Sequence, residues 1–254
     1  MKTSLNRWIQ VVIVMILAIP GTVMEVPAAS QEEIDYTITS HLALLLRSAR
    51  EVISHHQDLI NEQKADKALK PKRVLQEAKA NYSKATGRSF PKLNKQSLEG
   101  RLLLALEDAI LEVMEQAQPQ INDPKRGFKG FLPAVFAYKV AESFDLKVGD
   151  VAYLKLTAPE ELVRHKGNLP DIWESQVIKN KFQSSGWKKD MYVAETAELK
   201  GKKAFRLLTP EYYQTSCLAC HGEPKGAVDI TGGKKEGAKL GDLGGAISAA
   251  IYLK

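Results

Sequence analysis

Residues 134–157 read AVFAYKVAESFDLKVGDVAYLKLT, and the hydrophobic pattern changes its period within this stretch. From Ala134 to Phe144 apolar side chains recur three and four residues apart, which is typical of a helix with one buried face. From Val151 to Thr157 a short and largely apolar run follows Gly149 and Asp150, which is typical of a strand. The chain therefore changes here from a helical half to a half that contains strands.

Upstream of this stretch the pattern is helical as far back as Ser30. Ser30 and Glu33 have the spacing of a capping box, and apolar residues then recur at helical intervals up to Ile60. Further helices are predicted from Arg73 to Tyr82 and from Leu98 to Gln116. A helical layer is thus expected to precede the strands.

The helical half also contains an internal repeat. Its first copy reads Val52-Ile53-x-x-x-Gln57-x-x-Ile60-Asn61-x-x-Lys64, followed by Lys67-x-Leu69-x-Pro71. Its second copy reads Val113-Met114-x-x-x-Gln118-x-x-Ile121-Asn122-x-x-Lys125, followed by Lys129-x-Phe131-x-Pro133. The pattern predicts a duplicated helix, turn and second helix, with each proline in a first helical turn, where its missing N–H is tolerated. A chance match is the alternative, because two copies are too few for a solenoid.

Downstream of the quoted stretch we predict three more strands and one helix. The strands are expected from Tyr192 to Glu198, Ala204 to Leu208 and Ala246 to Leu253, and the helix from Asp171 to Phe182. Strands with a helical layer on one side form an α+β fold, here with a mixed or antiparallel sheet. The regions are therefore a helical one at residues 30–149 and a strand-containing one at 150–254.

The first 29 residues are interpreted as a signal peptide. Lys2 and Arg7 precede an apolar run from Trp8 to Ile19, and small residues follow up to Ala28 and Ala29, near which we place the cleavage. The apolar run is shorter than the roughly 20 residues that a transmembrane helix needs. We expect a periplasmic or secreted protein with no stable membrane insertion once the signal is cleaved, the alternative being an uncleaved anchor.

Length and composition exclude several classes of protein. The chain has 254 residues, enough for one sizeable domain or two small ones. Its net charge of +6 is mildly basic, without the basic stripes of a nucleic-acid-binding protein. The whole chain has only 2 cysteines, which excludes a disulfide scaffold.

Both cysteines lie in one motif, Cys217-Leu218-Ala219-Cys220-His221, which is the attachment signature of c-type haem. Two cysteines at this spacing are one helical turn apart, so their sulfurs can reach the two vinyl groups of the porphyrin. The histidine that follows can then place a ring nitrogen against the iron. We therefore predict one covalent haem c, with Cys217, Cys220 and His221 as its protein ligands.

Three other interpretations of the motif remain open. Half of a zinc site is one, although zinc needs about four ligands and no second Cys-x-x-Cys exists. A thioredoxin-type dithiol is another, although the motif lacks the early βαβ placement of that family. The third is a chance match around a structural disulfide.

The sixth ligand of the iron must come from upstream of the motif, because the residues after His221 include no histidine, methionine or cysteine. We favour His56, which lies on the apolar stripe of the long first helix. Histidines on that stripe can instead be hydrogen-bonded core residues, and a vacant sixth position would suit a gas or peroxide ligand. The other candidates are His41, His55, His165, Met114 and Met191.

The segment from Gly222 to Gly245 is rich in glycine, which would let the backbone approach a flat macrocycle closely. An ordinary mobile loop is the alternative. Apolar contacts with the haem are predicted for Ile230, Leu240 and Leu243. Cations that would neutralise its propionates are predicted at Lys234, Lys235, Lys239 and Arg206.

The chain resembles a family of extracytoplasmic c-type haem proteins with a PAS-like sensor fold. The matches include Gly127–Ala137, Thr157-Ala158-Pro159, Pro170-Asp171-x-Trp173-Glu174, Phe205-Arg206, the run from Cys217 to Gly232, Lys235-Glu236-Gly237 and Gly241–Ser248. The resemblance implies covalent haem on Cys217 and Cys220 with His221 as proximal ligand, and a role in redox or small-ligand sensing or in electron transfer. A family member with thiolate ligation uses a cysteine on its N-terminal helix as the distal ligand. No third cysteine exists here, and by helix position His56 would stand in for it.

The function expected from the sequence is redox or small-ligand sensing, or one-electron transfer, by a monohaem protein. Its partner would be a redox protein or a membrane signalling protein. A peroxidase-like enzyme with an open sixth position is the alternative, for which Arg164 and His165 are the residues to test. A binding module with an incidental Cys-x-x-Cys is the third possibility.

Overall fold

The computed structural model of the protein describes residues 29–254. The signal peptide predicted for residues 1–29, with cleavage near Ala28 or Ala29, lies outside the described residues apart from Ala29. Among the helices that the structure describes, none is both long and apolar enough to span a membrane.

Five helices make up residues 29–149, at the bounds α1 Gln31–His55, α2 Gln57–Asn61, α3 Pro71–Thr86, α4 Leu98–Ile121 and α5 Pro133–Val148. The predicted capping box begins α1, where the Ser30 hydroxyl accepts from the Glu33 N–H and the Glu33 carboxylate accepts from the Ser30 N–H. The helical pattern that runs to Ile60 is divided between α1 and α2, because His56 leaves the helical conformation.

The sheet consists of β1 Ala152–Thr157, β2 Val193–Leu199, β3 Lys202–Tyr212 and β4 Leu243–Tyr252, in the order β1-β4-β3-β2. All three pairings are antiparallel, so the sheet is antiparallel rather than mixed. The predicted helix from Asp171 to Phe182 is formed by α6 Ile172–Val177 and a π-helical turn at Ile178–Phe182. The architecture is α+β with N-terminal helices, as predicted.

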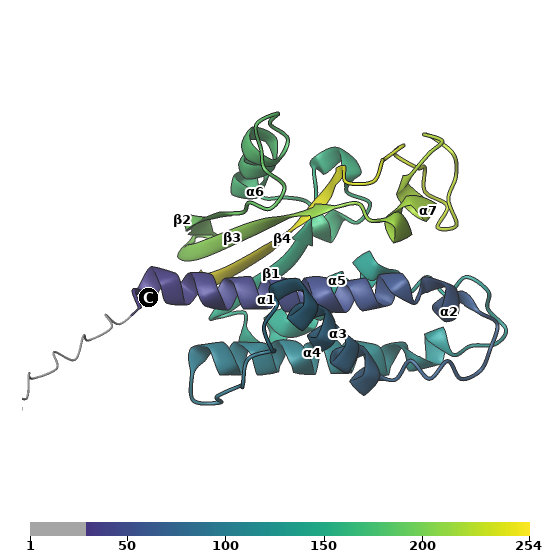
Figure 1. Ribbon diagram of the computed structural model, residues 1–254, viewed down its shortest axis with the longest axis horizontal. Helices are drawn as coiled ribbons and strands as arrows, with labels where there is room; N and C mark the ends of the chain where they lie inside the picture. Colours follow the sequence, from purple (N-terminus) through teal and green to yellow (C-terminus); the bar gives the residue numbers. More distant parts are fainter. Residues whose placement is uncertain (1–28) are drawn as a thin grey trace, which may run out of the picture.

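Helices cover both faces of the sheet. In Figure 1 the helices α1 and α5 lie directly under the sheet, α3 and α4 lie beyond them, and α6 lies on the opposite face. Side chains of β4 alternate accordingly, with Ile247, Ala249 and Ile251 in the core shared with the helices and Ala246 packed under α6. Strand and helix residues thus share one hydrophobic core.

The two glutamines of the sequence repeat make equivalent contacts across the helical half. The Gln57 amide donates to the Phe131 carbonyl at 3.0 Å, and the Gln118 amide donates to the Leu69 carbonyl at 3.1 Å. Each glutamine therefore donates to a backbone carbonyl in the other copy, in the segment that links its two helices.

The two asparagines of the repeat act in the same reciprocal way. The Asn61 side-chain oxygen accepts from the Lys129 N–H at 3.0 Å, and that of Asn122 accepts from the Lys67 N–H at 3.2 Å. Each connection then enters a helix through a proline at its first turn, in α3 and in α5. The repeated residues thus fasten the two copies to each other.

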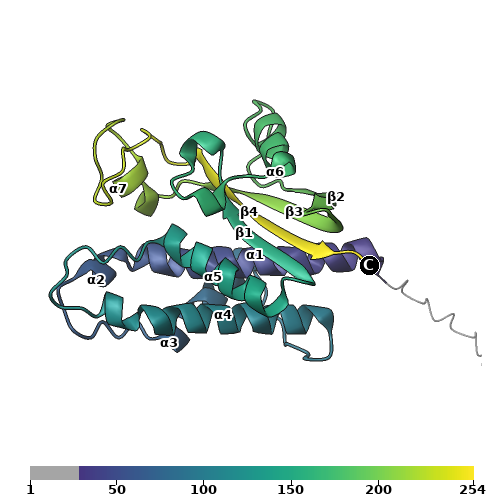
Figure 2. The same ribbon diagram turned by 180° about the vertical axis from the view of Figure 1, so that it is seen from behind.

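The segment with the Cys-x-x-Cys-His motif lies at one end of the molecule. Figures 1 and 2 show α7, Leu218–His221, and a long loop projecting beyond the sheet at the end where α2 lies. The beginning of α1 and the C-terminus lie at the opposite end.

Candidate functional site

A short helical segment after β3 brings the three motif residues together. A 3-10 turn at Thr215–Cys217 leads into α7 at Leu218–His221, so that Cys217, Cys220 and His221 lie within about one turn. Gly222 closes the segment by donating to the Leu218 carbonyl at 2.9 Å, and a β-carbon there would lie 2.6 Å from that oxygen. Both cysteines are free thiols and partly exposed.

The His221 ring is held by a carboxylate. Its Nδ1 lies 2.8 Å from Oε2 of Glu236. Since a carboxylate only accepts hydrogen bonds, the contact assigns a proton to Nδ1, and in the neutral ring the lone pair is then on Nε2. This is the arrangement in which a histidine binds a metal, with the second ring nitrogen oriented by a hydrogen-bond acceptor.

Tyr213 forms one wall beside His221. The two rings stack with centroids 5.0 Å apart, and the Tyr213 hydroxyl lies 3.4 Å from His221 Nδ1. Burial, and then the nearby Glu236, raises the pKa of Tyr213. Its backbone pairs with Asp242 and Gly241, which closes the base of the loop, so the His221 ring rests on a rigid support.

The loop after the motif contains a small hairpin. Val228 and Lys234 form a β-bridge, and the turn between them passes through Gly232, whose φ is +82°. The Asp229 carboxylate accepts from the N–H and hydroxyl of Thr231 and from the guanidinium of Arg164. Burial would raise the pKa of Asp229, but these hydrogen bonds outweigh it and lower the pKa to about 2.

Apolar side chains in this loop face solvent. Val228 is 69% exposed, Ile230 60% and Leu240 63%. Exposed apolar side chains that gather beside reactive groups indicate a surface that a ligand covers. Val228, Ile230 and Leu240 follow the motif in the same loop, so apolar side chains are available there for a flat and largely apolar ligand. Leu243, also predicted to contact the haem, packs instead with the cluster under α6.

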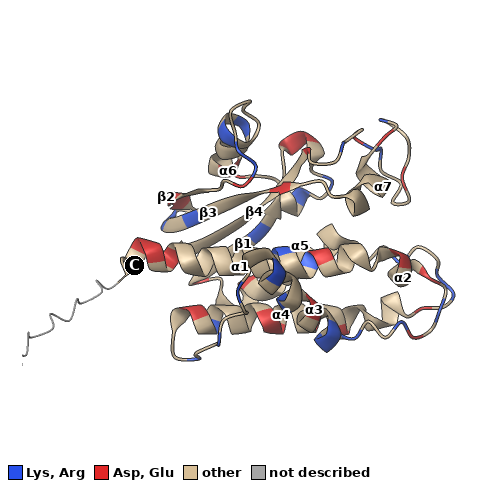
Figure 3. Cartoon of the chain, viewed as in Figure 1, with Lys and Arg blue, Asp and Glu red and all other residues tan. Residues whose placement is uncertain are grey.

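Charged residues of both signs lie along the loop beside α7, as Figure 3 shows. Lys234, Lys235 and Lys239 belong to it, and their role beside haem propionates stays a prediction. Arg206 does not belong to the loop, and that prediction was wrong. Its guanidinium is 1% exposed under α6, where it donates to the Asp171 carboxylate at 2.6 Å and lies over the Trp173 ring.

The structure pairs His56 with the helical half. His56 Nε2 lies 2.7 Å from Glu77 of α3, which also accepts from Arg73. Ser54 of α1 contacts the motif segment, with its hydroxyl 2.8 Å from that of Ser216. The contact with Glu77 engages only Nε2 of His56, so Nδ1 is the ring nitrogen that could bind an iron.

The other ligand candidates have separate surroundings. His41 contacts Glu99 at 2.6 Å, His55 is exposed, and His165 packs on the Tyr138 ring. Met114 is buried in the helical core and Met191 is half exposed. The structure thus brings together Cys217, Cys220 and His221, while these candidates contact other parts of the fold.

Sequence reasoning missed the roles of Glu236 and Arg164. Glu236 follows His221 by fifteen residues within a glycine-rich loop, and no spacing rule connects a ligand histidine to its acceptor. Arg164 was considered only as part of a catalytic pair. An acidic residue near a Cys-x-x-Cys-His motif is the one signal that would have suggested Glu236.

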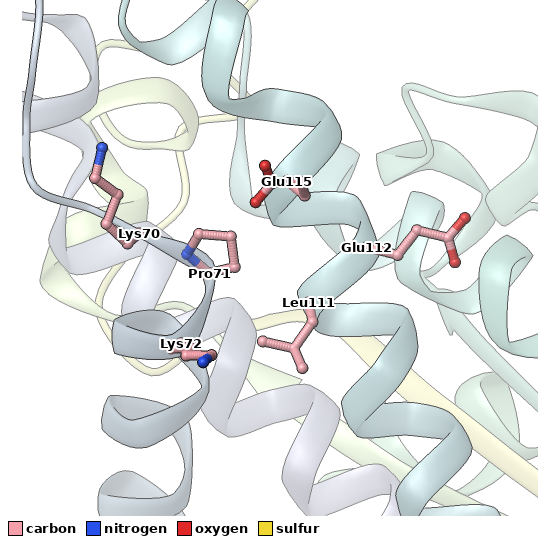
Figure 4. A pocket seen from close by; sticks show the side chains of 6 residues that line it. All are labelled: Lys70, Pro71, Lys72, Leu111, Glu112 and Glu115. Carbon is pink, nitrogen blue, oxygen red and sulfur yellow. The ribbon is translucent and has the colours of Figure 1, made fainter.

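Two surface hollows lie away from the motif. One, of about 540 Å³, lies between α3 and α4, and Figure 4 shows the six side chains that line it: Lys70, Pro71, Lys72, Leu111, Glu112 and Glu115. The other, of about 230 Å³, lies between α1 and β3 and includes Tyr36 and Tyr192. Within residues 29–254 no three His, Cys, Asp or Glu side chains cluster as a site for a metal ion.

Comparison with known proteins places the chain in a family. The family model described as Tll0287-like matches residues 39–251, which include both the helical half and the sheet. No curated protein and no solved structure matches.

Proposed function

The chain belongs to the Tll0287-like family, and from this and the geometry around His221 we propose that it is a periplasmic or secreted monohaem c-type protein. Its role would be redox or small-ligand sensing, or one-electron transfer. The PAS-like character of the fold is part of the same proposal. Export through the N-terminal signal suits this function, because c-type haem is attached outside the cytoplasm.

The observation that carries the proposal is the hydrogen bond between His221 Nδ1 and Glu236 Oε2, 2.8 Å long, directly after two free cysteines in the same helical turn. His41 and His56 also have a carboxylate at one ring nitrogen, so what distinguishes His221 is that it combines this contact with a place directly after the two cysteines. A dithiol or a disulfide would require neither an oriented histidine nor an exposed apolar surface beside it.

The residues present have distinct tasks in this proposal. Cys217 and Cys220 would hold the haem through thioether bonds, and His221 would bind the iron through Nε2. When bound, the haem supplies an iron that exchanges one electron and can take a small ligand. Glu236 orients the ring and would increase its basicity, while Val228, Ile230 and Leu240 would supply apolar contacts to the bound haem.

The position of the site fits exchange with a partner. The motif segment lies at an end of the molecule, and its cysteines and histidine are partly exposed. A separate redox protein or membrane signalling protein is the partner class we propose, because an exposed site can pass an electron or a signal across a surface contact.

A peroxidase-like activity would require Arg164 and His165 to act together on one ligand. The Arg164 guanidinium instead contacts the loop that holds His221, and the His165 ring packs at a tilt against Tyr138, with centroids 4.3 Å apart. We therefore propose a sensing or electron-transfer role rather than an enzymatic one.

The test is a haem-stained gel and a pyridine haemochrome assay on protein produced with cytochrome maturation machinery. We expect a red protein with one covalent haem per chain. A colourless protein under these conditions would contradict the proposal.

The sixth ligand can be tested on the same protein. His56 remains our prediction, and His56→Ala should convert low-spin to high-spin iron and allow rapid carbon monoxide binding. The neighbouring exposed histidine provides a matched control, His55→Ala, which should leave the spectrum unchanged. Rapid carbon monoxide binding by the wild type would instead mean an open or weakly held sixth position, and an unchanged spectrum in His56→Ala rules His56 out.

A further inference from the structure

Arg164 lies far from the motif in sequence but against it in space. It belongs to the connection after β1, between two short 3-10 turns at Glu160–Leu162 and Lys166–Asn168. Its guanidinium donates to four acceptors on the segment that carries the motif, two carboxylates and two backbone carbonyls. A single side chain thus links the connection after β1 to four residues of the motif segment and its loop, which are Cys220, Asp229, Lys234 and Glu236.

The two carboxylates come from opposite arms of the loop. Arg164 donates to Asp229 at 2.6 Å and to Glu236 at 2.9 Å. The Asp229 side chain is completely buried, and its second oxygen accepts from Thr231 and Gly233. Because charged hydrogen bonds of this length are the strong ones, Arg164 fixes both arms.

Glu236 is shared between Arg164 and the histidine. One of its oxygens accepts from Arg164 Nε, and the other contacts His221 Nδ1 at 2.8 Å. The carboxylate is therefore held from one side while it orients the ring from the other. Its position and its effective charge both depend on the guanidinium.

The backbone contacts complete the arrangement. Arg164 donates to the carbonyls of Cys220 and Lys234, both at 3.1 Å. The Cys220 carbonyl belongs to the same helical turn as His221, so the guanidinium holds that turn and the carboxylate that acts on it. The five N–H donors in the planar fork of an arginine can serve these four acceptors, whereas a lysine ammonium has only three donors.

We propose that Arg164 is a positioning residue for the haem iron, which holds Glu236 beside His221 and offsets the charge of its carboxylate, and so limits the donor strength of the proximal histidine. This inference rests on the proposed function and deepens it, because it names the group that tunes the site. It places Arg164 on the proximal side, whereas the sequence suggested it only as a partner of a distal ligand.

Removing Arg164 and removing the charge of Glu236 should change the reduction potential of the haem in opposite directions. Without the guanidinium, Glu236 is left uncompensated beside His221, so the ring becomes a stronger donor and the ferric state is favoured. Without the carboxylate charge, the ring becomes a weaker donor and the ferrous state is favoured. A residue that only supported the fold would not shift the potential in opposite directions.

The first experiment measures the midpoint potential of the haem protein by spectroelectrochemistry. Arg164→Gln should lower the potential, Glu236→Gln should raise it, and Arg164→Lys should lie between wild type and Arg164→Gln. The matched control is Arg101→Gln, at an exposed arginine of α4, which should have no effect. Unchanged potentials in both Arg164→Gln and Glu236→Gln, with haem content retained, would overturn the inference.

The second experiment does not need the haem. Amide hydrogen exchange is measured over residues 222–242 in the full chain carrying Cys217→Ala and Cys220→Ala. Adding Arg164→Gln or Arg164→Lys should speed exchange of the Gly226 and Gly233 amides about tenfold or more, while exchange in the helical half stays unchanged. Equal exchange with and without the substitution would contradict the inference.

The two experiments separate this inference from the function on which it rests. A wild-type protein that takes up no haem contradicts the proposed function, and the exchange measurement then still decides whether Arg164 holds the loop. If Arg164→Gln does not accumulate, Asp229→Asn removes only one of its partners and should also speed exchange of the loop amides.

Discussion

Two parts of the molecule contain irregular connections that are held by side chains from distant parts of the sequence, and they are held in different ways. In the helical half, the amides of Gln57, Asn61, Gln118 and Asn122 bond reciprocally to the connections of the other copy. In the half that contains the sheet, one guanidinium, that of Arg164, holds the loop that follows the motif.

The two sets of contacts differ in charge, and this difference distinguishes polar groups that only support the fold from polar groups that act on a reactive side chain. Neutral amide hydrogen bonds to backbone groups contribute about 0.5–1.5 kcal/mol each and change nothing in the electrostatics of a reactive group. The charged cluster around Arg164 ends on the imidazole of His221 and therefore influences what that ring can bind. Reciprocal neutral contacts thus indicate a scaffold, and convergent charged contacts indicate a site.

The largest expected effect removes the cofactor and leaves the scaffold. Cys217→Ala with Cys220→Ala should abolish covalent haem completely, because no other cysteine exists to attach it. Pyridine haemochrome assays and far-UV circular dichroism measure haem content and helical content on the same sample. Ser216→Ala is the control that should keep its haem, and haem retained by the double variant would contradict the assignment.

A substitution in the shared core should have the opposite outcome. Leu46→Ala removes a fully buried side chain from α1 and should destabilise the protein by about 2–5 kcal/mol, with haem attachment retained. Urea unfolding measures the effect. Leu146→Ala, at a leucine of α5 that is 89% exposed, should cost almost nothing. Equal stability of the two variants would show that the described core is wrong.

The reciprocal contacts predict a matched pair of effects. Gln57→Ala and Gln118→Ala each leave a backbone carbonyl without its donor, and each should cost about 1–3 kcal/mol. Gln116→Ala, at an exposed position of the same helix as Gln118, is the control and should be neutral. A large cost for one glutamine and none for the other would break the equivalence of the two copies.

The charged cluster predicts a pH dependence that the neutral contacts lack. The pKa of Asp229 is about 2 in the folded protein, below the value of about 3.9 in an unfolded chain. Its contribution, at most about 2–3 kcal/mol, is fully present above the unfolded pKa and is lost as the pH falls through the folded one. Urea unfolding of the wild type and Asp229→Asn should therefore differ by a constant amount down to about pH 4, and by progressively less below it. A difference that grows on acidification would contradict the assigned partners.

Much of the fold could be predicted from the sequence because it follows from local periodicity. The strand at Val151–Thr157 and the helix at Ala134–Phe144 differ from β1 and α5 by only a few residues at their ends. The break at His56 was not predicted, because apolar residues on both sides keep the helical spacing. The order in which the strands pair could not be predicted either, because it depends on contacts between residues far apart in sequence.

The site could be predicted only as far as its motif. Cys217, Cys220 and His221 follow from one short pattern, whereas Glu236 and Arg164 reach His221 through the folding of a long loop and a distant strand connection. Arg206 was misplaced for the same reason, because its partners Asp171 and Glu174 come from a helix on the other face of the sheet. Long-range pairing of charges leaves no periodic signal in a sequence.

The most direct test of the central claim is mass spectrometry of the tryptic peptide 207–225, which contains both cysteines and His221 and has no internal lysine or arginine. On protein matured with the cytochrome machinery, we predict that this peptide carries the mass of one haem on Cys217 and Cys220. Recovery of the same peptide with free or disulfide-bonded cysteines and no haem would contradict the account.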